Sequence, residues 1–312
     1  MAMTQEFWDR MREEWKQGDA QRDAGLTTPE DVVRYDDLAY GPDGVWNLLD
    51  IYRQRELPEE KMPVIISIHG GGWFYGTKEI YQYYLMDLAK RGFITVNFNY
   101  HLAPEHPFPA AVSDMAAVIR FVQEHAQEYH MDLSRVILIG DSAGGQMCGM
   151  YTNFCTNPEY AQEMCRRYPE QFPGKEALVP NGFVPAAVGL HCGVYDTVES
   201  YCGEGTHDDG IYLDALLAPA TRDKVELIDV IRHMSASFPP AYVLTAEHDF
   251  LVYQMPLLTA RMDQLGIRYQ AKEYGKGDEQ VQHVFMCNLK LAEATLANDE
   301  ECAFFHKVTA KQ

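Results

Sequence analysis

The sequence of 312 residues has few basic residues, and its amino-terminal stretch has no long apolar run. Lys and Arg number 26 against 46 Asp and Glu, which gives a formal net charge of −20. Such a charge disfavours a nucleic-acid backbone, an anionic membrane surface or a strongly anionic substrate as a partner. Residues 1–19 mix both charges, so they predict neither a secretory signal nor a membrane anchor, and a cytoplasmic protein is expected.

The seven cysteines are an odd number and lack the paired spacing of metal ligands. A reducing compartment tolerates such thiols, and their expected role is packing in the core. The histidines are scattered and give no ligand set either. The sequence therefore predicts no metal and no cofactor.

Apolar runs rich in β-branched residues alternate with segments of helical spacing along most of the chain. The segments 78–91, 111–127, 143–154, 254–265 and 284–307 have helical spacing. The runs typical of strands covered on both faces are PVIISIHG, FITVNFNY, RVILIG, AAVGLHCG and AYVLTAEHD. NLLDIY, after the turn GPDG, is expected to pair antiparallel, and YQAKEYG is a weaker last strand. The pattern predicts an α/β fold, with a mostly parallel eight-stranded sheet covered by helices on both faces.

The length favours one domain over residues 1–312, with insertions. Segments 1–36, 155–182 and 199–236 fit no strand–helix unit. We expect these three segments to supply a cap or lid.

Ser142 stands in Gly140-Asp141-Ser142-Ala143-Gly144, directly after a predicted buried strand. This matches the G-x-S-x-G elbow, in which glycines flank a serine in a sharp strand-to-helix turn. Two interpretations stay open for the motif alone. The glycines allow a helix to pack closely on the sheet, or they hold Ser142 in a turn where its hydroxyl reacts.

A reactive serine needs donors for a developing oxyanion. The run PVIISIHG continues as His69-Gly70-Gly71-Gly72-Trp73, where residues without side chains allow backbone N–H groups to converge on one oxygen. Gly71 and Gly72, with Ala143, are the candidate donors. The alternative is a phosphate-binding loop, but no G-x-x-x-x-G-K-[ST] pattern follows.

The acid and the base should come from later strand ends. Asp249 ends the last strongly apolar strand, whereas Asp196 is expected to cap a turn. His283 lies in the loop after the last strand, in the chain order serine, acid, histidine. His306 falls near the end of the terminal helical segment, where a solvated role is expected.

The segments HGGGW, NYHLAPEHPFPAAVSD, GDSAGG, EHDFLV and QHVF occur in that order. Together they resemble the hormone-sensitive lipase-like branch of the α/β-hydrolase superfamily, which includes carboxylesterases and acetyl esterases. The resemblance covers about residues 45–307. It implies an α/β-hydrolase fold in which Ser142 is the nucleophile, Asp249 the acid and His283 the base. The implied oxyanion donors are Gly71, Gly72 and Ala143.

Three positions depart from the family pattern. His101 stands where the family usually has arginine, which leaves open what pairs with a carboxylate such as Glu105. Phe250 stands where proline is common, and Val284 where glycine is common. Glu105 and Asp114 are expected to be structural.

The expected activity is hydrolysis of small, uncharged, short-chain acyl esters, including acetylated sugars, through an acyl-enzyme. Trp73, Phe74 and Tyr75 are candidates for the wall of the substrate pocket, the alternative being packing of the loop against the cap. Two other functions stay open: an amidase, formamidase or peptidase on the same core, and a non-catalytic protein that binds a small ligand. A homodimer is compatible with the sequence.

Overall fold

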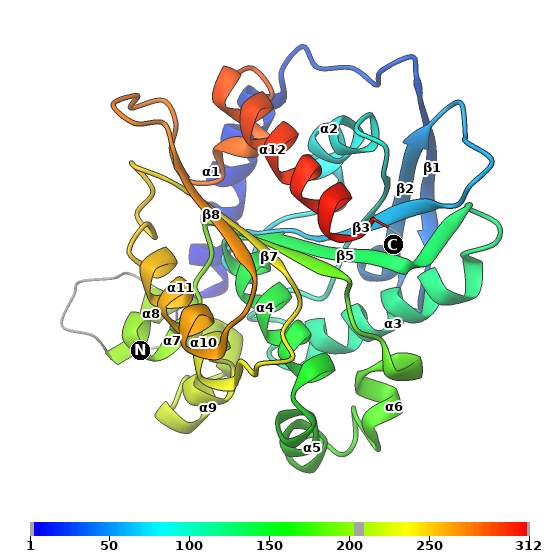
Figure 1. The fold of residues 1–312 in the computed structure, drawn as a ribbon. Helices are drawn as coiled ribbons and strands as arrows, with labels where there is room; N and C mark the ends of the chain where they lie inside the picture. Colours follow the sequence, from blue (N-terminus) through cyan, green and yellow to red (C-terminus); the bar gives the residue numbers. More distant parts are fainter. Residues whose placement is uncertain (1–2, 203–208, 311–312) are drawn as a thin grey trace.

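The sheet at the centre of the molecule has the strand order β1-β2-β4-β3-β5-β6-β7-β8 (Figure 1). The protein is represented by a computed structural model that describes residues 3–202 and 209–310. The strands are β1 (Val32–Ala39), β2 (Leu48–Gln54), β3 (Met62–Ile68), β4 (Ile94–Phe98), β5 (Met131–Asp141), β6 (Ala187–His191), β7 (Ala241–Ala246) and β8 (Tyr269–Tyr274). Strand β2 pairs antiparallel with β1 and β4, and all other pairs are parallel. The predicted fold class is confirmed.

Helices cover both faces of the sheet, because alternate strand residues point to opposite sides. Val64 and Ile66 of β3 lie in the core between the sheet and helices α3 (Ala110–His125) and α4 (Ala143–Thr156). Ile65 lies in the core on the opposite face, between the sheet and helices α2 (Lys78–Ala89) and α12 (Ala292–Val308). In Figure 1, α2 and α12 lie above the sheet, and α3 and α4 lie below it. The helices are α1 (Gln5–Asp23), α2 (Lys78–Ala89), α3 (Ala110–His125), α4 (Ala143–Thr156), α5 (Pro158–Arg167), α6 (Lys175–Leu178), α7 (Thr197–Cys202), α8 (Asp209–Leu217), α9 (Arg222–Leu227), α10 (Val230–His233), α11 (Gln254–Leu265) and α12 (Ala292–Val308).

Two predicted segments differ from the structure. Residues 32–36 of the first cap candidate belong to β1, which pairs with β2 at the edge of the sheet. The helix expected over 284–307 is interrupted: Val284 has a φ of 60°, a short 3₁₀ turn spans Phe285–Cys287, and α12 begins at Ala292. A left-handed residue cannot continue a right-handed helix, so the apolar spacing before Ala292 comes from a loop.

The cap candidate 199–236 contains α8, α9, α10 and all of α7 except its first two residues, and its residues 203–208 lie outside the described part of the chain. Within the described residues, no helix has both the length and the apolar character needed to cross a membrane.

Candidate active site

Segments far apart in the sequence meet around a cleft of about 590 Å³ at the carboxyl edge of the sheet. The loops after β3, β7 and β8 and the turn from β5 to α4 all contribute to its lining, together with α1 and α8. Ser142, His283 and the three candidate oxyanion donors line this cleft. They come together because the carboxyl ends of parallel strands share one edge of a sheet.

Ser142 lies in the turn between β5 and α4, with a φ of 52° and a ψ of −120°. A positive φ is unfavourable for a residue with a side chain, by on the order of 1–3 kcal/mol. The amide of Ser142 donates to the His191 carbonyl at 2.9 Å, and the Gln146 amide donates to the Ser142 carbonyl at 3.1 Å. The turn is therefore held on both sides of the serine.

The glycines around Ser142 are required by the close approach of backbone. A Cβ on Gly144 would lie 2.0 Å from the carbonyl oxygen of Ile68, and one on Gly140 would lie 2.2 Å from the carbonyl oxygen of Gly144. Helix α4 therefore packs on the sheet at a distance that only glycine permits. The two interpretations of the motif are compatible, because this close packing accompanies the sharp turn at Ser142.

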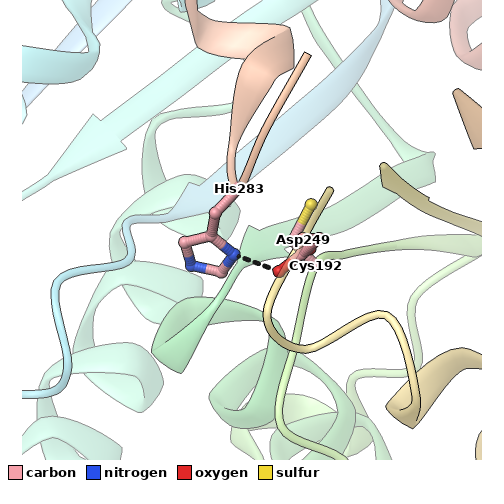
Figure 2. A group of neighbouring side chains, drawn as sticks. All are labelled: Cys192, Asp249 and His283. Atoms are coloured by element: carbon pink, nitrogen blue, oxygen red, sulfur yellow. Dashed lines mark hydrogen bonds and ion pairs between the residues drawn. The ribbon is translucent and has the colours of Figure 1, made fainter. Parts of the chain in front are cut away.

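His283 and Asp249 form a hydrogen-bonded pair in which the ring Nδ1 lies 2.8 Å from Oδ1 of the carboxylate (Figure 2). Oδ1 of Asp249 also accepts the Leu251 amide at 2.8 Å, and Oδ2 accepts the Thr245 hydroxyl at 2.9 Å. Burial alone would raise the pKa of Asp249, but the hydrogen bond and the charge of His283 and the Leu251 amide hold that pKa below its usual value. The carboxylate is thus an ionised group that orients the imidazole.

The competing residues have other partners. Oδ1 of Asp196 accepts the Glu199 amide at 2.7 Å, at the start of α7, which is the capping role expected from the sequence. Nε2 of His306 donates to the carbonyl of Arg91 at 2.8 Å. Among the residues that the structure describes, neither side chain lines the cleft.

The loop after β3 contains backbone that only glycine adopts without strain. Gly71 and Gly72 have φ values of 111° and 56°, and a Cβ on Gly71 would lie 2.1 Å from the carbonyl oxygen of Tyr75. Within the described ranges, no hydrogen bond uses the amide N–H of Gly71, Gly72 or Ala143. All three residues line the cleft, where a substrate oxygen would supply an acceptor for these amides.

Three side chains that the sequence analysis did not single out support this loop. The Tyr81 hydroxyl donates to Oδ2 of Asp141 at 2.6 Å and accepts the Gly70 amide at 3.0 Å. The Tyr100 hydroxyl donates to the His69 carbonyl at 2.8 Å. Burial raises the pKa of Asp141, and the bond from Tyr81 offsets part of that effect. The position of Asp141 beside Ser142 was the available sequence signal, whereas nothing local marked the tyrosines.

The three aromatic candidates of the pocket wall have different environments. Trp73 and Tyr75 line the cleft, and the Trp73 indole N–H donates to Oε1 of Gln146 at 3.2 Å. Phe74 is fully buried, and its ring packs against Trp8, Trp15 and Tyr212. Phe74 thus has the packing role that was the alternative, and its side chain does not line the cleft.

Helix α1 forms one wall of the cleft through Trp15, Asp19 and Arg22. The Tyr75 hydroxyl donates to Oδ2 of Asp19 at 2.5 Å, which joins this helix to the loop after β3. Tyr212 of α8 also lines the cleft. Cap candidates 1–36 and 199–236 therefore both reach the cleft. No residue of 155–182, all of which the structure describes, lies in its wall.

Arg12 attaches α1 to the body of the protein. Its guanidinium donates to the carbonyls of Phe74 and Ala103 at 2.9 and 3.0 Å, and to both carboxylate oxygens of Glu105 at 2.8 and 2.6 Å. His101 instead lies 2.9 Å from Asp114. The partner of Glu105 that the sequence left open is thus an arginine 93 residues away along the chain.

We expect Glu105→Gln to destabilise the protein by about 1 kcal/mol near neutral pH, since the pair is partly exposed. Burial would raise the pKa of Glu105, but its bonds with Arg12 and Gln5 hold that pKa at about 2, below the ordinary value of 4.5. The contribution of the carboxylate is therefore complete above pH 4.5 and lost as the pH falls from 4.5 towards 2. Urea denaturation across this range should show the two proteins converging.

The control is Glu13→Gln, since within the described residues the Glu13 carboxylate bonds only to Gln17, on the exposed side of α1. This variant should match the wild type throughout. A difference between wild type and Glu105→Gln that stays constant down to pH 2 would contradict the assignment.

Cys192, Asp249 and His283 each place one ligand-type atom within 4.8 Å of the others (Figure 2). Burial, followed by the charge of Asp249, raises the pKa of the Cys192 thiol well above its usual value. The Asp249 oxygen of this group already bonds the ring nitrogen of His283. That contact is the one an acid–base pair requires.

Comparison with known proteins places the chain among esterases and related hydrolases. Residues 49–256 match the sequence model of the BD-FAE family. The carboxylesterase NlhH of Mycobacterium tuberculosis is 28% identical over 234 residues, which are 72% of this chain and 69% of NlhH. Esterase LipC of the same organism is 29% identical over 128 residues, 41% of this chain, and the alignment spans only 32% of LipC.

Among solved structures, esterase B from Lactobacillus rhamnosis, inhibited by a tributyrin phosphonate, is similar with a TM-score of 0.84. It is 23% identical, and the alignment covers 98% of this chain and 97% of that protein. This likeness establishes the shared fold over nearly the whole chain.

Proposed function

The chain belongs to the BD-FAE family, on an α/β-hydrolase fold of the hormone-sensitive lipase-like type, and we propose that it is a serine-dependent carboxylic ester hydrolase. One observation carries the proposal. The strained Ser142, the hydrogen-bonded pair of His283 and Asp249, and three amides without protein acceptors in the described chain all meet at one cleft.

In the proposed mechanism, Nε2 of His283 takes the proton of the Ser142 hydroxyl as the oxygen attacks the ester carbonyl. The amides of Gly71, Gly72 and Ala143 stabilise the oxyanion that forms. His283 then protonates the leaving alcohol, and the acyl group stays on Ser142. A water molecule, activated by the same imidazole, releases the acid. Asp249 holds the ring in the tautomer with Nδ1 protonated and stabilises the imidazolium.

We propose small, uncharged esters with short acyl chains as substrates. The aromatic side chains of Trp15, Trp73 and Tyr212 in the wall, and the attachment of α1 beside the oxyanion loop, favour a bounded site over an open lipid-binding groove. Gln280, Gln282 and Asn288 line the same cleft and offer hydrogen bonds to the hydroxyl groups of an acetylated sugar. The inhibitor of esterase B is a tributyrin phosphonate, and tributyrin is itself an ester of short acyl chains.

A fluorophosphonate probe is expected to label wild-type protein at Ser142. In a series of p-nitrophenyl esters from acetate to dodecanoate, kcat/KM should be highest for the shortest acyl chains. The matching amides should be hydrolysed far more slowly. Peptide mapping locates the label, and Ser134→Ala is the control serine variant because that hydroxyl bonds to Asp132. Folded protein that takes up no label would favour the non-catalytic binding function. Preference for amides would favour an amidase, and a maximum at long chains would overturn the short-acyl preference.

A further inference from the structure

Phe250 is a large apolar side chain that the fold leaves in the mouth of the cleft. It is 62% exposed, and among the described residues it is the one exposed phenylalanine, tyrosine or tryptophan. Full burial of such a ring is worth about 1.5–3 kcal/mol, and this fold forgoes that gain. Proline is common in the family at the position that Phe250 occupies here.

The backbone around Phe250 is fixed, so its ring is not a loosely placed surface group. Asp249 and Leu251 on either side are buried, 3% and 2% exposed. The Leu251 amide donates to the carboxylate of Asp249 at 2.8 Å, and the Val252 amide donates to the Asp249 carbonyl at 3.0 Å. With both neighbours turned inward, the tight turn directs Phe250 outward into the cleft.

The ring of Phe250 lies beside the proposed catalytic imidazole. The two ring centroids are 4.4 Å apart, with the planes inclined by 46°. On the proposed function, the ester carbonyl oxygen faces the amides of Gly71, Gly72 and Ala143, and His283 hands its proton to the oxygen of the leaving alcohol. A group packed against His283 therefore meets the alcohol part of the ester rather than the acyl part.

We infer that Phe250 is a specificity residue for the alcohol side of the substrate and that it favours esters of aromatic or other flat apolar alcohols. The inference rests on the proposed function and adds to it the class of alcohol. An aromatic ring in the substrate would pack against Phe250 in an offset or tilted arrangement, which is the favourable geometry for such pairs. The same contact would cover the exposed face of Phe250 when the ester binds.

The test compares esters that share one acyl group and differ in the alcohol: ethyl acetate, phenyl acetate and 2-naphthyl acetate. Phe250→Ala should lower kcat/KM about tenfold for 2-naphthyl acetate, less for phenyl acetate, and less than about twofold for ethyl acetate. Hydrolysis of the acetyl-enzyme should be unchanged, because the alcohol has left by then. Pre-steady-state release of naphthol separates the two steps.

A product-binding measurement tests the contact without chemistry. Inhibition of ethyl acetate hydrolysis by 2-naphthol should require about tenfold more naphthol in Phe250→Ala than in wild type. Leu257→Ala is the matched control, since Leu257 is an exposed apolar residue of α11 that does not line the cleft. It should leave both readouts unchanged.

Equal losses for all three esters, or slower hydrolysis of the acetyl-enzyme, would mean that Phe250 only shields or orients His283, and would overturn the inference. An unchanged preference among the alcohols would overturn it as well while leaving the proposed function intact. If the wild type hydrolyses none of the three esters, both fail.

Discussion

Replacing Ser142 with alanine is expected to lower kcat for ester hydrolysis roughly a million-fold, the loss typical when a serine nucleophile is removed. The fold should survive, because within the described residues the Ser142 hydroxyl makes no hydrogen bond. Alanine also keeps the Cβ, so the strain of the turn at φ 52° is unchanged. Kinetics with p-nitrophenyl acetate and thermal unfolding of the same sample measure both expectations.

The control for this experiment is again Ser134→Ala, which removes a hydroxyl that bonds to Oδ1 of Asp132 at 2.6 Å. That variant should keep wild-type turnover. Turnover by Ser142→Ala within about tenfold of wild type, once contaminating esterase has been excluded, would reject Ser142 as the nucleophile.

Asp249→Asn is expected to lower kcat about 10⁴-fold. The asparagine side chain can place an N–H where Oδ1 now lies 2.8 Å from Nδ1 of His283. The ring would then carry its proton on Nε2 and could not accept the serine proton. It would also lose the ionised partner that stabilises the imidazolium, a partner kept charged by the lowered pKa of Asp249.

Asp196→Asn separates the two candidate acids. Its Oδ1 accepts the Glu199 amide at 2.7 Å at the start of α7, and an asparagine oxygen can accept the same bond. Turnover of that variant should stay within a few-fold of wild type. If Asp196→Asn instead shows the 10⁴-fold loss and Asp249→Asn does not, the acid has been misassigned.

The parts of the fold that depend on local pattern could be predicted from the sequence. Buried parallel strands are nearly continuous apolar runs, and the ends of such strands share one edge of the sheet. The placement of Ser142, His283 and Gly71 in one cleft follows from these two facts. The glycine turns could be predicted for the same reason, because their chemistry is local.

Contacts between distant segments could not be predicted. Nothing near Glu105 indicates that its partner is Arg12, since the family arginine is absent from position 101 and the new partner lies on α1. Adjacent aromatic residues such as Phe74 and Tyr75 look alike in sequence, yet the turn sends one into the core and the other into the cleft. The left-handed conformation of Val284, which delays the start of α12, also depends on tertiary packing.

Because φ is positive at Ser142, thermal stability and turnover favour different residues at this one position. Glycine would adopt this backbone more readily than serine, so the residue best suited to the turn is one that cannot attack an ester. A library screened for thermal stability alone should therefore replace serine with glycine at position 142 and lose activity. Loss of serine at 142 in such a screen, and its retention when turnover is selected as well, would show that the residue is kept for its chemistry.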